Sequence, residues 1–241
     1  MGWEYTDGEA VGLFDAVILD HDGTIVNSHD AMVRAYTRWA GEYGVDLNEM
    51  PKYMGMPSRA LTEALVPDAK RWDEAAERIE ELEVSDTTGV VPMPGAVDAF
   101  RVLPGDAVAI ATSCTQPLLD ARLNAAGLPH PRVVVTRDQV EHGKPAPDSF
   151  LLAAKRLGME PSRALVAEDA FAGIAAARAG GFPTLGILST HTADALRADV
   201  HVTDLSQVTW DVSGEGIRVI VHVPADDSSA PAVTGRMPCR D

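Results

Sequence analysis

The chain has 241 residues, 46% of them hydrophobic and 23% charged, which is the composition of a globular protein with a sizeable core. Its formal net charge of −16 argues against binding to nucleic acid or to an anionic membrane surface, since both need clustered Lys and Arg. No apolar run approaches the roughly 18 residues that span a bilayer, and the polar N-terminus shows no secretory signal, so a cytoplasmic protein is expected.

Short apolar runs recur along the chain, and the later ones alternate with segments whose apolar residues have helical spacing. Strands are expected at residues 15–20, 106–112, 131–136, 163–169 and 182–188. Helices that end near a glycine are expected at residues 116–127, 148–158 and 170–180. This alternation predicts an α/β fold with a Rossmann-like, doubly wound parallel sheet, in which ligands bind at the carboxyl ends of the strands.

The first two strands are about 85 residues apart, far more than one crossover helix needs. The intervening segment predicts helices at 29–44, 57–65 and 71–85, and its acidic stretch 73–86 is interpreted as a solvated helix face. It ends at Pro92, Pro94 and Gly95, which indicate a hinge. The expected domains are an α/β core (1–28 and 93–212), an inserted helical cap (29–92), and a C-terminal strand with a flexible tail (213–241).

Polar residues follow four of the expected strands, where parallel strands share an edge. Asp20, Asp22 and Asp169 are expected to form an oxygen-rich pocket, which suits Mg²⁺ because this cation prefers oxygen ligands. A hydroxyl and a lysine, Thr112 and Lys144, suit a phosphoryl group bound opposite the metal. The sequence therefore predicts a magnesium-dependent site for a phosphorylated ligand.

The motifs D-x-D-G-T (20–24), a strand ending in Thr112, G-K-P-x-P-D (143–148), and E-D followed by G-I-x-A-A (168–177) occur in this order. With these motifs in this order, the chain resembles members of the haloacid dehalogenase superfamily. The helical insert resembles the cap of subfamily I, which includes sugar-phosphate phosphatases and the related β-phosphoglucomutases.

The resemblance implies a role for each matching residue. Asp20 would be the nucleophile that forms an aspartyl-phosphate, and Asp22 the general acid and base. The Asp20 and Asp169 carboxylates and the Asp22 carbonyl would hold Mg²⁺, with Glu168 in or just behind that shell. The phosphoryl oxygens would be bound by Thr112, Ser113 and Lys144.

Other positions bear on the choice of reaction. His21 is expected to be packed with its side chain turned away from Asp20 and Asp22. The second aspartate disfavours halide displacement. Met32 stands where β-phosphoglucomutases have a histidine, which weakens that alternative without removing it. In the cap, Tyr36 and Arg59 are expected to contact the substrate.

The expected activity is therefore hydrolysis of a small sugar or polyol phosphate by a monomeric enzyme. The alternatives are a mutase that transfers the phosphoryl group within a sugar phosphate, and a binding protein that kept the fold without the chemistry.

Overall fold

The computed structural model describes residues 2–6, 8–50 and 58–222, and its centre is a six-stranded sheet. The strand order is β10-β9-β8-β3-β6-β7, and every neighbouring pair is parallel. The strands are β3 (Ala16–Leu19), β6 (Val108–Ala111), β7 (Val133–Val135), β8 (Ala164–Glu168), β9 (Thr184–Ile187) and β10 (Val200–Val202). The predicted doubly wound parallel sheet is confirmed, and β10 is a strand that the sequence analysis missed.

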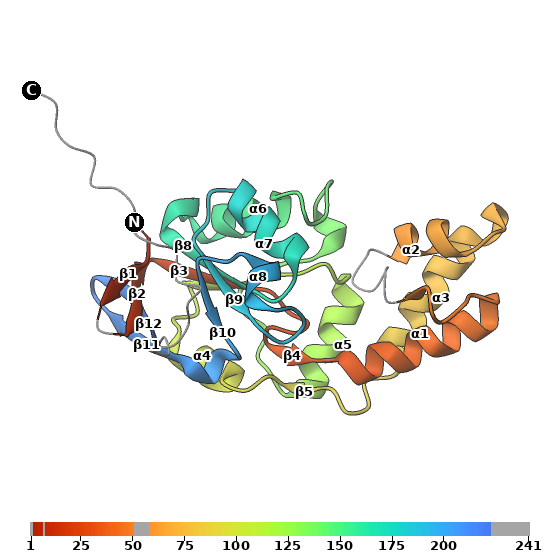
Figure 1. Cartoon of the computed structure of the whole chain (residues 1–241), viewed down its shortest axis with the longest axis horizontal. Helices are drawn as coiled ribbons and strands as arrows, with labels where there is room; N and C mark the ends of the chain where they lie inside the picture. Colours follow the sequence, from red (N-terminus) through yellow and green to blue (C-terminus); the bar gives the residue numbers. More distant parts are fainter. Residues whose placement is uncertain (1, 7, 51–57, 223–241) are drawn as a thin grey trace, which may run out of the picture.

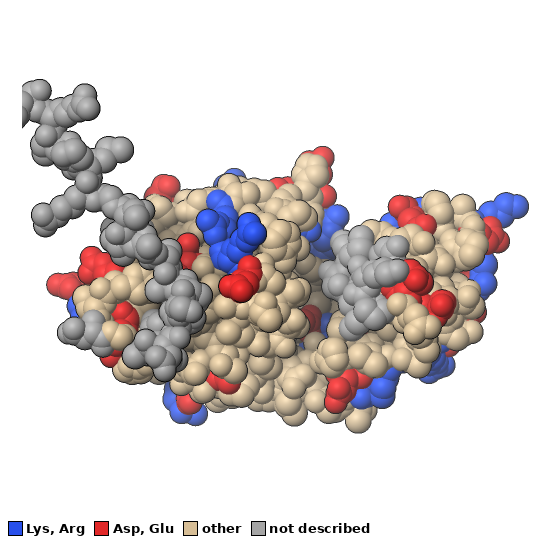
Figure 2. Space-filling view, in the orientation of Figure 1, with Lys and Arg blue, Asp and Glu red and all other residues tan. Residues whose placement is uncertain are grey.

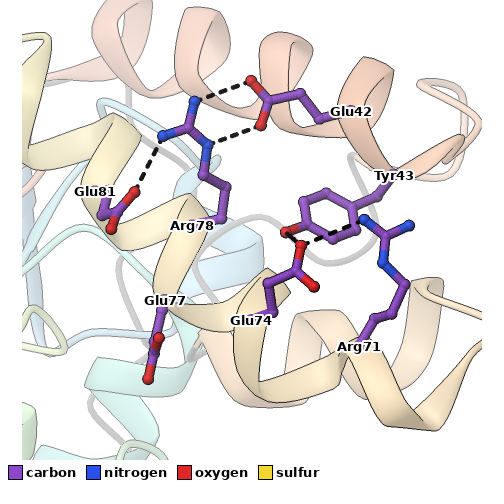
Figure 3. A pocket seen from close by; sticks show the side chains of 7 residues that line it. All are labelled: Glu42, Tyr43, Arg71, Glu74, Glu77, Arg78 and Glu81. Atoms are coloured by element: carbon purple, nitrogen blue, oxygen red, sulfur yellow. Dashed lines mark hydrogen bonds and ion pairs between the residues drawn. The ribbon is translucent and has the colours of Figure 1, made fainter.

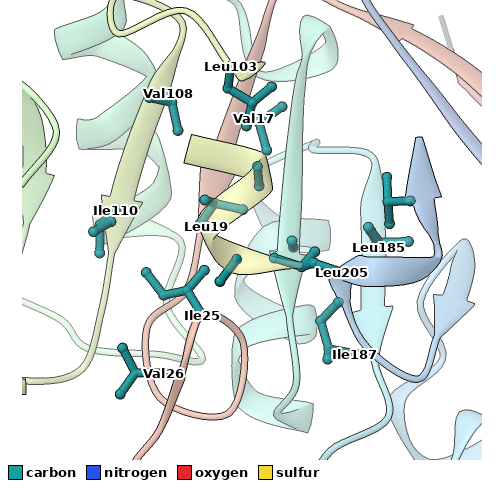
Figure 4. Close-up of a cluster of buried hydrophobic side chains, with 14 of the residues drawn as sticks. Val17, Leu19, Ile25, Val26, Leu103, Val108, Ile110, Leu185, Ile187 and Leu205 are labelled. Carbon is teal, nitrogen blue, oxygen red and sulfur yellow. The ribbon is translucent and has the colours of Figure 1, made fainter. Parts of the chain in front are cut away.

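Helices cover both faces of this sheet (Figure 1). The helices α6 (Asp148–Leu157) and α7 (Phe171–Ala179) pack on one face, against alternate strand residues such as Ile18. The other face, which includes Val17 and Leu19, packs against α4 (Ala96–Val102) and α5 (Gln116–Ala126) (Figure 4). Successive strand residues point to opposite faces, so a fully apolar strand is what a sheet covered on both sides requires. A short helix, α8 (Ala193–Leu196), precedes β10.

Gly127, Gly158 and Gly180 follow α5, α6 and α7, so the three helices expected to end near a glycine do so. Gly127 follows α5 with a φ of 65°, and Gly158 follows α6 with a φ of 72°. Both values lie in the left-handed region that glycine adopts without steric strain, and their N–H groups bond to carbonyls of the last helical turn. The sequence therefore determines these two boundaries locally.

A second sheet joins the two ends of the described chain, and the sequence analysis did not predict it. Its order is β1-β2-β12-β11, with antiparallel pairs between β1 (Glu4–Thr6), β2 (Glu9–Phe14), β12 (Gly216–His222) and β11 (Val208–Ser213). The expected C-terminal strand is found as β12, but β11 crosses the expected boundary at 212/213. In β2 the buried residues Ala10, Gly12 and Phe14 alternate with partly exposed ones, and this short pattern becomes a strand by pairing with β12. The predicted tail after residue 222 lies outside the described residues.

The insert contains the three helices that the sequence predicts: α1 (His29–Tyr43), α2 (Ser58–Leu65) and α3 (Trp72–Ser85). They form the lobe on the right of Figure 1 and share a hydrophobic core that includes the buried Trp39, Leu61 and Ile79. The chain enters the insert through β4 (Val26–Asn27) and leaves it through β5 (Val91–Pro92), and these two short strands pair antiparallel. Both connections to the core therefore lie side by side.

Ion pairs within the insert join α1 to α3 (Figure 3). Arg78 donates to both carboxylate oxygens of Glu42, at 2.7 and 3.0 Å, and to Glu81 at 3.0 Å. The Arg71 guanidinium lies 4.4 Å from the centre of the Tyr43 ring. Solvated pairs of this kind contribute little to stability, so the apolar core holds the helices together.

Acidic and basic side chains are interspersed on the coloured part of the surface in Figure 2. Among the helices of the described residues, none has the length and apolar character needed to cross a membrane.

Candidate active site

A cavity of about 540 Å³ lies at the carboxyl ends of the parallel strands, between the sheet and the insert. Residues from both parts of the chain line it. Of the residues singled out from the sequence, the lining includes Asp20, Asp22, Thr112, Ser113, Lys144 and Glu168 from the core, and Tyr36 and Arg59 from the insert. Asp169 adjoins it, since its carboxylate lies within 4.8 Å of those of Asp20 and Glu168. The fold thus brings together residues that are up to 149 positions apart in the sequence.

Lys144 is the central cation of this site. Its side chain is 6% exposed, and its Nζ donates to Asp20 Oδ1 at 2.5 Å, to Glu168 Oε2 at 2.6 Å and to the Ala111 carbonyl at 3.2 Å. Burial lowers the pKa of this ammonium, but the two carboxylates more than offset that effect and raise it. Lys144 therefore stays charged and can neutralise part of the negative charge of an incoming anion.

Three carboxylates compete for this one lysine. Burial, followed by the Glu168 carboxylate, raises the pKa of Asp20 well above its usual value despite Lys144. Burial and Glu168 likewise raise the pKa of Asp169 to about 7. Because a second cation would lower both values, the cluster Asp20, Glu168 and Asp169 is electrostatically suited to a bound metal ion.

The backbone around this cluster leaves room only for glycine at two positions. A Cβ on Gly23, whose φ is +81°, would lie 2.1 Å from Asp169 Oδ2. A Cβ on Gly173 would lie 1.8 Å from Glu168 Oε2. Both contacts are impossible for real atoms, so the glycines of D-x-D-G-T and of G-I-x-A-A allow the carboxylates to approach the chain closely. An all-oxygen donor set of this kind fits a hard divalent cation.

Two hydroxyl residues after β9 support the same cluster and were missed by the sequence analysis. Thr190 Oγ1 donates to Asp169 Oδ2 at 2.5 Å, and Ser189 Oγ donates to the Gly23 carbonyl at 2.7 Å. They lie two and three residues after the end of β9, so the rule that identified the other polar strand ends would also have found them. Their contacts hold the Asp169 side chain and the Gly23 loop in fixed positions.

The position of the Asp22 carboxylate differs from the predicted one. Its carboxylate does not join the cluster of Asp20 and Asp169 but belongs to a second group of side chains beside it. Its partners are Ser28 Oγ at 2.5 Å, Cys114 Sγ at 2.8 Å, Arg122 Nη1 at 2.9 Å and His21 Nδ1 at 3.1 Å. Burial alone would raise the pKa of Asp22, but Arg122 and His21 together hold it well below its usual range.

The expected orientation of His21 is therefore wrong, although the residue is fully buried as predicted. Strand β3 ends at Leu19, and the His21 carbonyl accepts hydrogen bonds from the N–H groups of Ile25 and Val26. The chain turns there, so the alternation of a strand no longer decides which way the side chain points.

The remaining core residues shape the phosphoryl side of the cavity. Thr112 is 3% exposed, and its hydroxyl accepts a hydrogen bond of 3.0 Å from the Cys114 N–H. Ser113 lines the cavity next to it. Both precede α5, so this loop lies near a helix N-terminus, where anions are stabilised.

The insert contributes residues that the sequence analysis expected and others that it missed. Arg59 is 48% exposed and already donates to Glu63 at 2.6 Å and to Asp73. Glu77 and Glu80 of α3 also line the cavity, and Glu80 accepts hydrogen bonds from Ser58, at 2.8 Å, and from Thr115 of the core. The interpretation of 73–86 as a solvated face is thus wrong for part of the stretch.

Comparison with known proteins identifies the family. Residues 17–187 match the family model described as haloacid dehalogenase-like hydrolase. Hexitol phosphatase A of Escherichia coli (strain K12) is 34% identical over 198 residues, covering 80% of this chain and 92% of that protein. A fructose-1-phosphate phosphatase of the same strain is 33% identical over 182 residues, covering 72% and 96%.

Solved structures share the fold. The crystal structure of a hydrolase from Pseudomonas syringae has a TM-score of 0.71 and 26% identity, covering 80% of this chain and 94% of that one. A β-phosphoglucomutase from Clostridium difficile has a TM-score of 0.69 at 21% identity, covering 82% and 94%. The chain therefore belongs to the haloacid dehalogenase-like hydrolase family.

Proposed function

We propose that this hydrolase is a magnesium-dependent phosphatase that acts on a small sugar or polyol phosphate through an aspartyl-phosphate on Asp20. The observation that carries the proposal is the buried cluster of Lys144 with Asp20, Glu168 and Asp169 at the floor of the cavity. A lysine and a cation site on either side of one carboxylate suit attack on a phosphoryl group, whose oxygens need positive charge around them. The phosphatase names of the relatives support the same reaction.

In the first step, an Asp20 carboxylate oxygen attacks phosphorus while the bond from phosphorus to the leaving oxygen breaks. Asp22, which is ionised in the free site, takes up the proton that the phosphate monoester brings and passes it to that oxygen, and the alcohol departs. In the second step, water attacks the aspartyl-phosphate and Asp22 takes a proton from it. The bond between Asp20 and phosphorus breaks, and inorganic phosphate leaves.

The other core residues bind and orient the phosphoryl group. Thr112, the Ser113 N–H and Lys144 hold its oxygens. Mg²⁺ would be held by Asp20, Glu168, Asp169 and the Asp22 carbonyl, and when bound it would offset the charge of the carboxylates and of the phosphoryl oxygens.

We also propose that residues 29–92 are a cap that selects the leaving group. The paired strands β4 and β5 place both connections at one point, which is the arrangement of a hinge. The acidic Glu77 and Glu80 on the cap side of the cavity suit sugar hydroxyls, because carboxylates accept hydrogen bonds. A second phosphoryl group would meet these carboxylates, which favours hydrolysis of a monophosphate over a mutase reaction through a bisphosphate.

The test is a panel of hexitol phosphates, fructose 1-phosphate, glycerol phosphate and glucose phosphates, scored for release of inorganic phosphate with Mg²⁺. We expect kcat/KM to differ by at least about tenfold between the best and the median substrate. Isomerisation of a sugar phosphate without phosphate release would instead support the mutase. No turnover of any ester would favour the non-catalytic alternative.

Arg59→Ala tests the role of the cap. The Arg59 guanidinium lines the cavity and has more N–H donors than its two carboxylate partners use, so it can also bind a substrate hydroxyl. We expect kcat/KM to fall by about tenfold or more for the best sugar phosphate, and by less than about threefold for p-nitrophenyl phosphate. The matched control is Arg38→Ala, an exposed arginine of α1 that pairs with Glu42. An equal proportional loss on both substrates would contradict substrate contact.

A further inference from the structure

Arg122 joins the candidate general acid to the insert. Its side chain, on α5, is 4% exposed. Nη1 lies 2.9 Å from Asp22 Oδ2, and Nη2 lies 2.8 Å from Glu83 Oε1 on α3. These three residues form an ion-pair chain, buried at Arg122 and Glu83 and partly exposed at Asp22, that runs from the D-x-D-G-T loop to the helix of the insert.

The surroundings of Arg122 show that packing at this position of α5 does not require a charged side chain. The other side chains on the buried face of α5 are apolar, as Leu118, Leu119 and Leu123 show. Replacing a buried ion pair with well-packed apolar residues is often neutral or stabilising. The buried Nε of Arg122 has no hydrogen-bond partner among the described residues, so its two Nη atoms make the specific contacts. A role in the reaction accounts for a buried arginine better than stability does.

We propose that Arg122 is a positioning residue for Asp22 in phosphoryl transfer, and that Glu83 of the insert holds Arg122 in place. The inference rests on the proposed function, because it assigns Arg122 a role in the step that Asp22 performs. The planar guanidinium, with one Nη on each carboxylate, fixes where Asp22 lies relative to α3. It also stabilises the carboxylate that Asp22 becomes when it gives its proton to the leaving oxygen.

His21, Asp22 and Cys114 lie close enough together to bind a metal ion, but Arg122 accounts for their grouping without one. The positive charge beside it comes from Arg122, whose Nη1 also lies 3.6 Å from Cys114 Sγ. Arg122 therefore supplies the charge that a metal ion would otherwise bring to these side chains.

Two polar contacts join α3 of the insert to α5 and the loop before it. Glu83 contacts Arg122, and Glu80 accepts a hydrogen bond from Thr115, just before α5. A shift of α3 would move Glu83 and so change how Arg122 holds Asp22. The position of the cap is thus coupled to the position of the general acid.

The experiment compares phenyl phosphate with p-nitrophenyl phosphate in the full-length enzyme. The two esters have the same ring, but nitrophenolate leaves without help whereas phenolate needs a proton. The parameter measured is kcat/KM, because it reports only the steps up to departure of the alcohol. The variants are Arg122→Gln, Arg122→Lys and Glu83→Gln. The matched control is Glu81→Gln, on the same helix with a 66% exposed side chain.

We expect Arg122→Gln to lower kcat/KM by about 10- to 100-fold for phenyl phosphate and by less than about fivefold for p-nitrophenyl phosphate. Arg122→Lys should recover part of the loss, because it keeps the positive charge but lacks the two Nη atoms that bind Asp22 and Glu83 at once. Glu83→Gln should give a smaller loss with the same preference, and Glu81→Gln none. Burial raises the pKa of Glu83 to about 7 even though Arg122 lies beside it, so the assays are run above that pH, where Glu83 is ionised.

Equal losses on the two esters, or no loss, would overturn the proposal, since a purely structural arginine does not distinguish leaving groups. If Arg122→Gln does not fold, the test rests on Glu83→Gln, in which the ratio of kcat/KM for the two esters is compared with that of the wild type. An unchanged ratio would overturn the proposal. A wild-type enzyme that hydrolyses no phosphate ester would overturn the proposed function instead.

Discussion

Replacing Asp20 with asparagine is expected to lower phosphatase turnover by at least about 10⁴-fold while leaving the fold intact. The amide cannot attack phosphorus. Glu168, the other carboxylate that pairs with Lys144, has its second oxygen engaged by the N–H groups of Asp169 and Ala170, so it does not replace Asp20. Turnover is measured as phosphate release from the best substrate of the panel. Formation of the aspartyl-phosphate is followed by trapping with radiolabelled substrate and acid quench, and Asp20→Asn should give no label.

The thermal stability of Asp20→Asn shows whether a loss of activity comes from the missing nucleophile or from unfolding. Burial already disfavours the charged form of Asp20, and Lys144 keeps Glu168 as a partner when Asp20 becomes neutral. The thermal unfolding midpoint should therefore stay the same or rise. Asp98→Asn, at an exposed position of α4, is the matched control for the substitution. Near-normal activity in a carefully purified Asp20→Asn sample would remove Asp20 from the role of nucleophile.

Removal of divalent cations with EDTA is expected to abolish turnover, and excess Mg²⁺ should restore it. Without a cation, Asp20, Glu168 and Asp169 share only Lys144, and a phosphoryl group would add further negative charge. Mg²⁺ should serve better than Zn²⁺, because the cluster offers carboxylate oxygens and neither nitrogen nor sulfur.

Ca²⁺ should inhibit the Mg²⁺-supported reaction. Its bonds to oxygen are about 2.3–2.6 Å, against about 2.0–2.1 Å for Mg²⁺, and its geometry is looser, so it would displace Asp20 from the line of attack. Binding is checked independently of activity by the rise in thermal midpoint when Mg²⁺ is added, which should be smaller in Asp169→Asn. Full activity in EDTA, or equal activation by Ca²⁺ and Mg²⁺, would contradict the assignment of the site.

The sequence by itself determined the parallel sheet, the helices around it and the grouping of the site residues. Apolar runs and helical spacing are local patterns, so β3 and α5 could be predicted close to their observed bounds. The grouping followed from topology, because the carboxyl ends of parallel strands meet at one edge. For that reason Asp20, Lys144 and Asp169 could be placed together from positions far apart in the chain.

Only the tertiary structure decided the features that depend on contacts between distant segments. The second sheet forms because β12 pairs with β2, about 200 residues away, and neither strand signals its partner. The acidic stretch of α3 has the composition of a solvated face, yet Glu83 is buried because Arg122 lies opposite it. Asp22 turns toward the same arginine, since a carboxylate in a turn follows the nearest buried positive charge, and a local pattern cannot show where that charge will be.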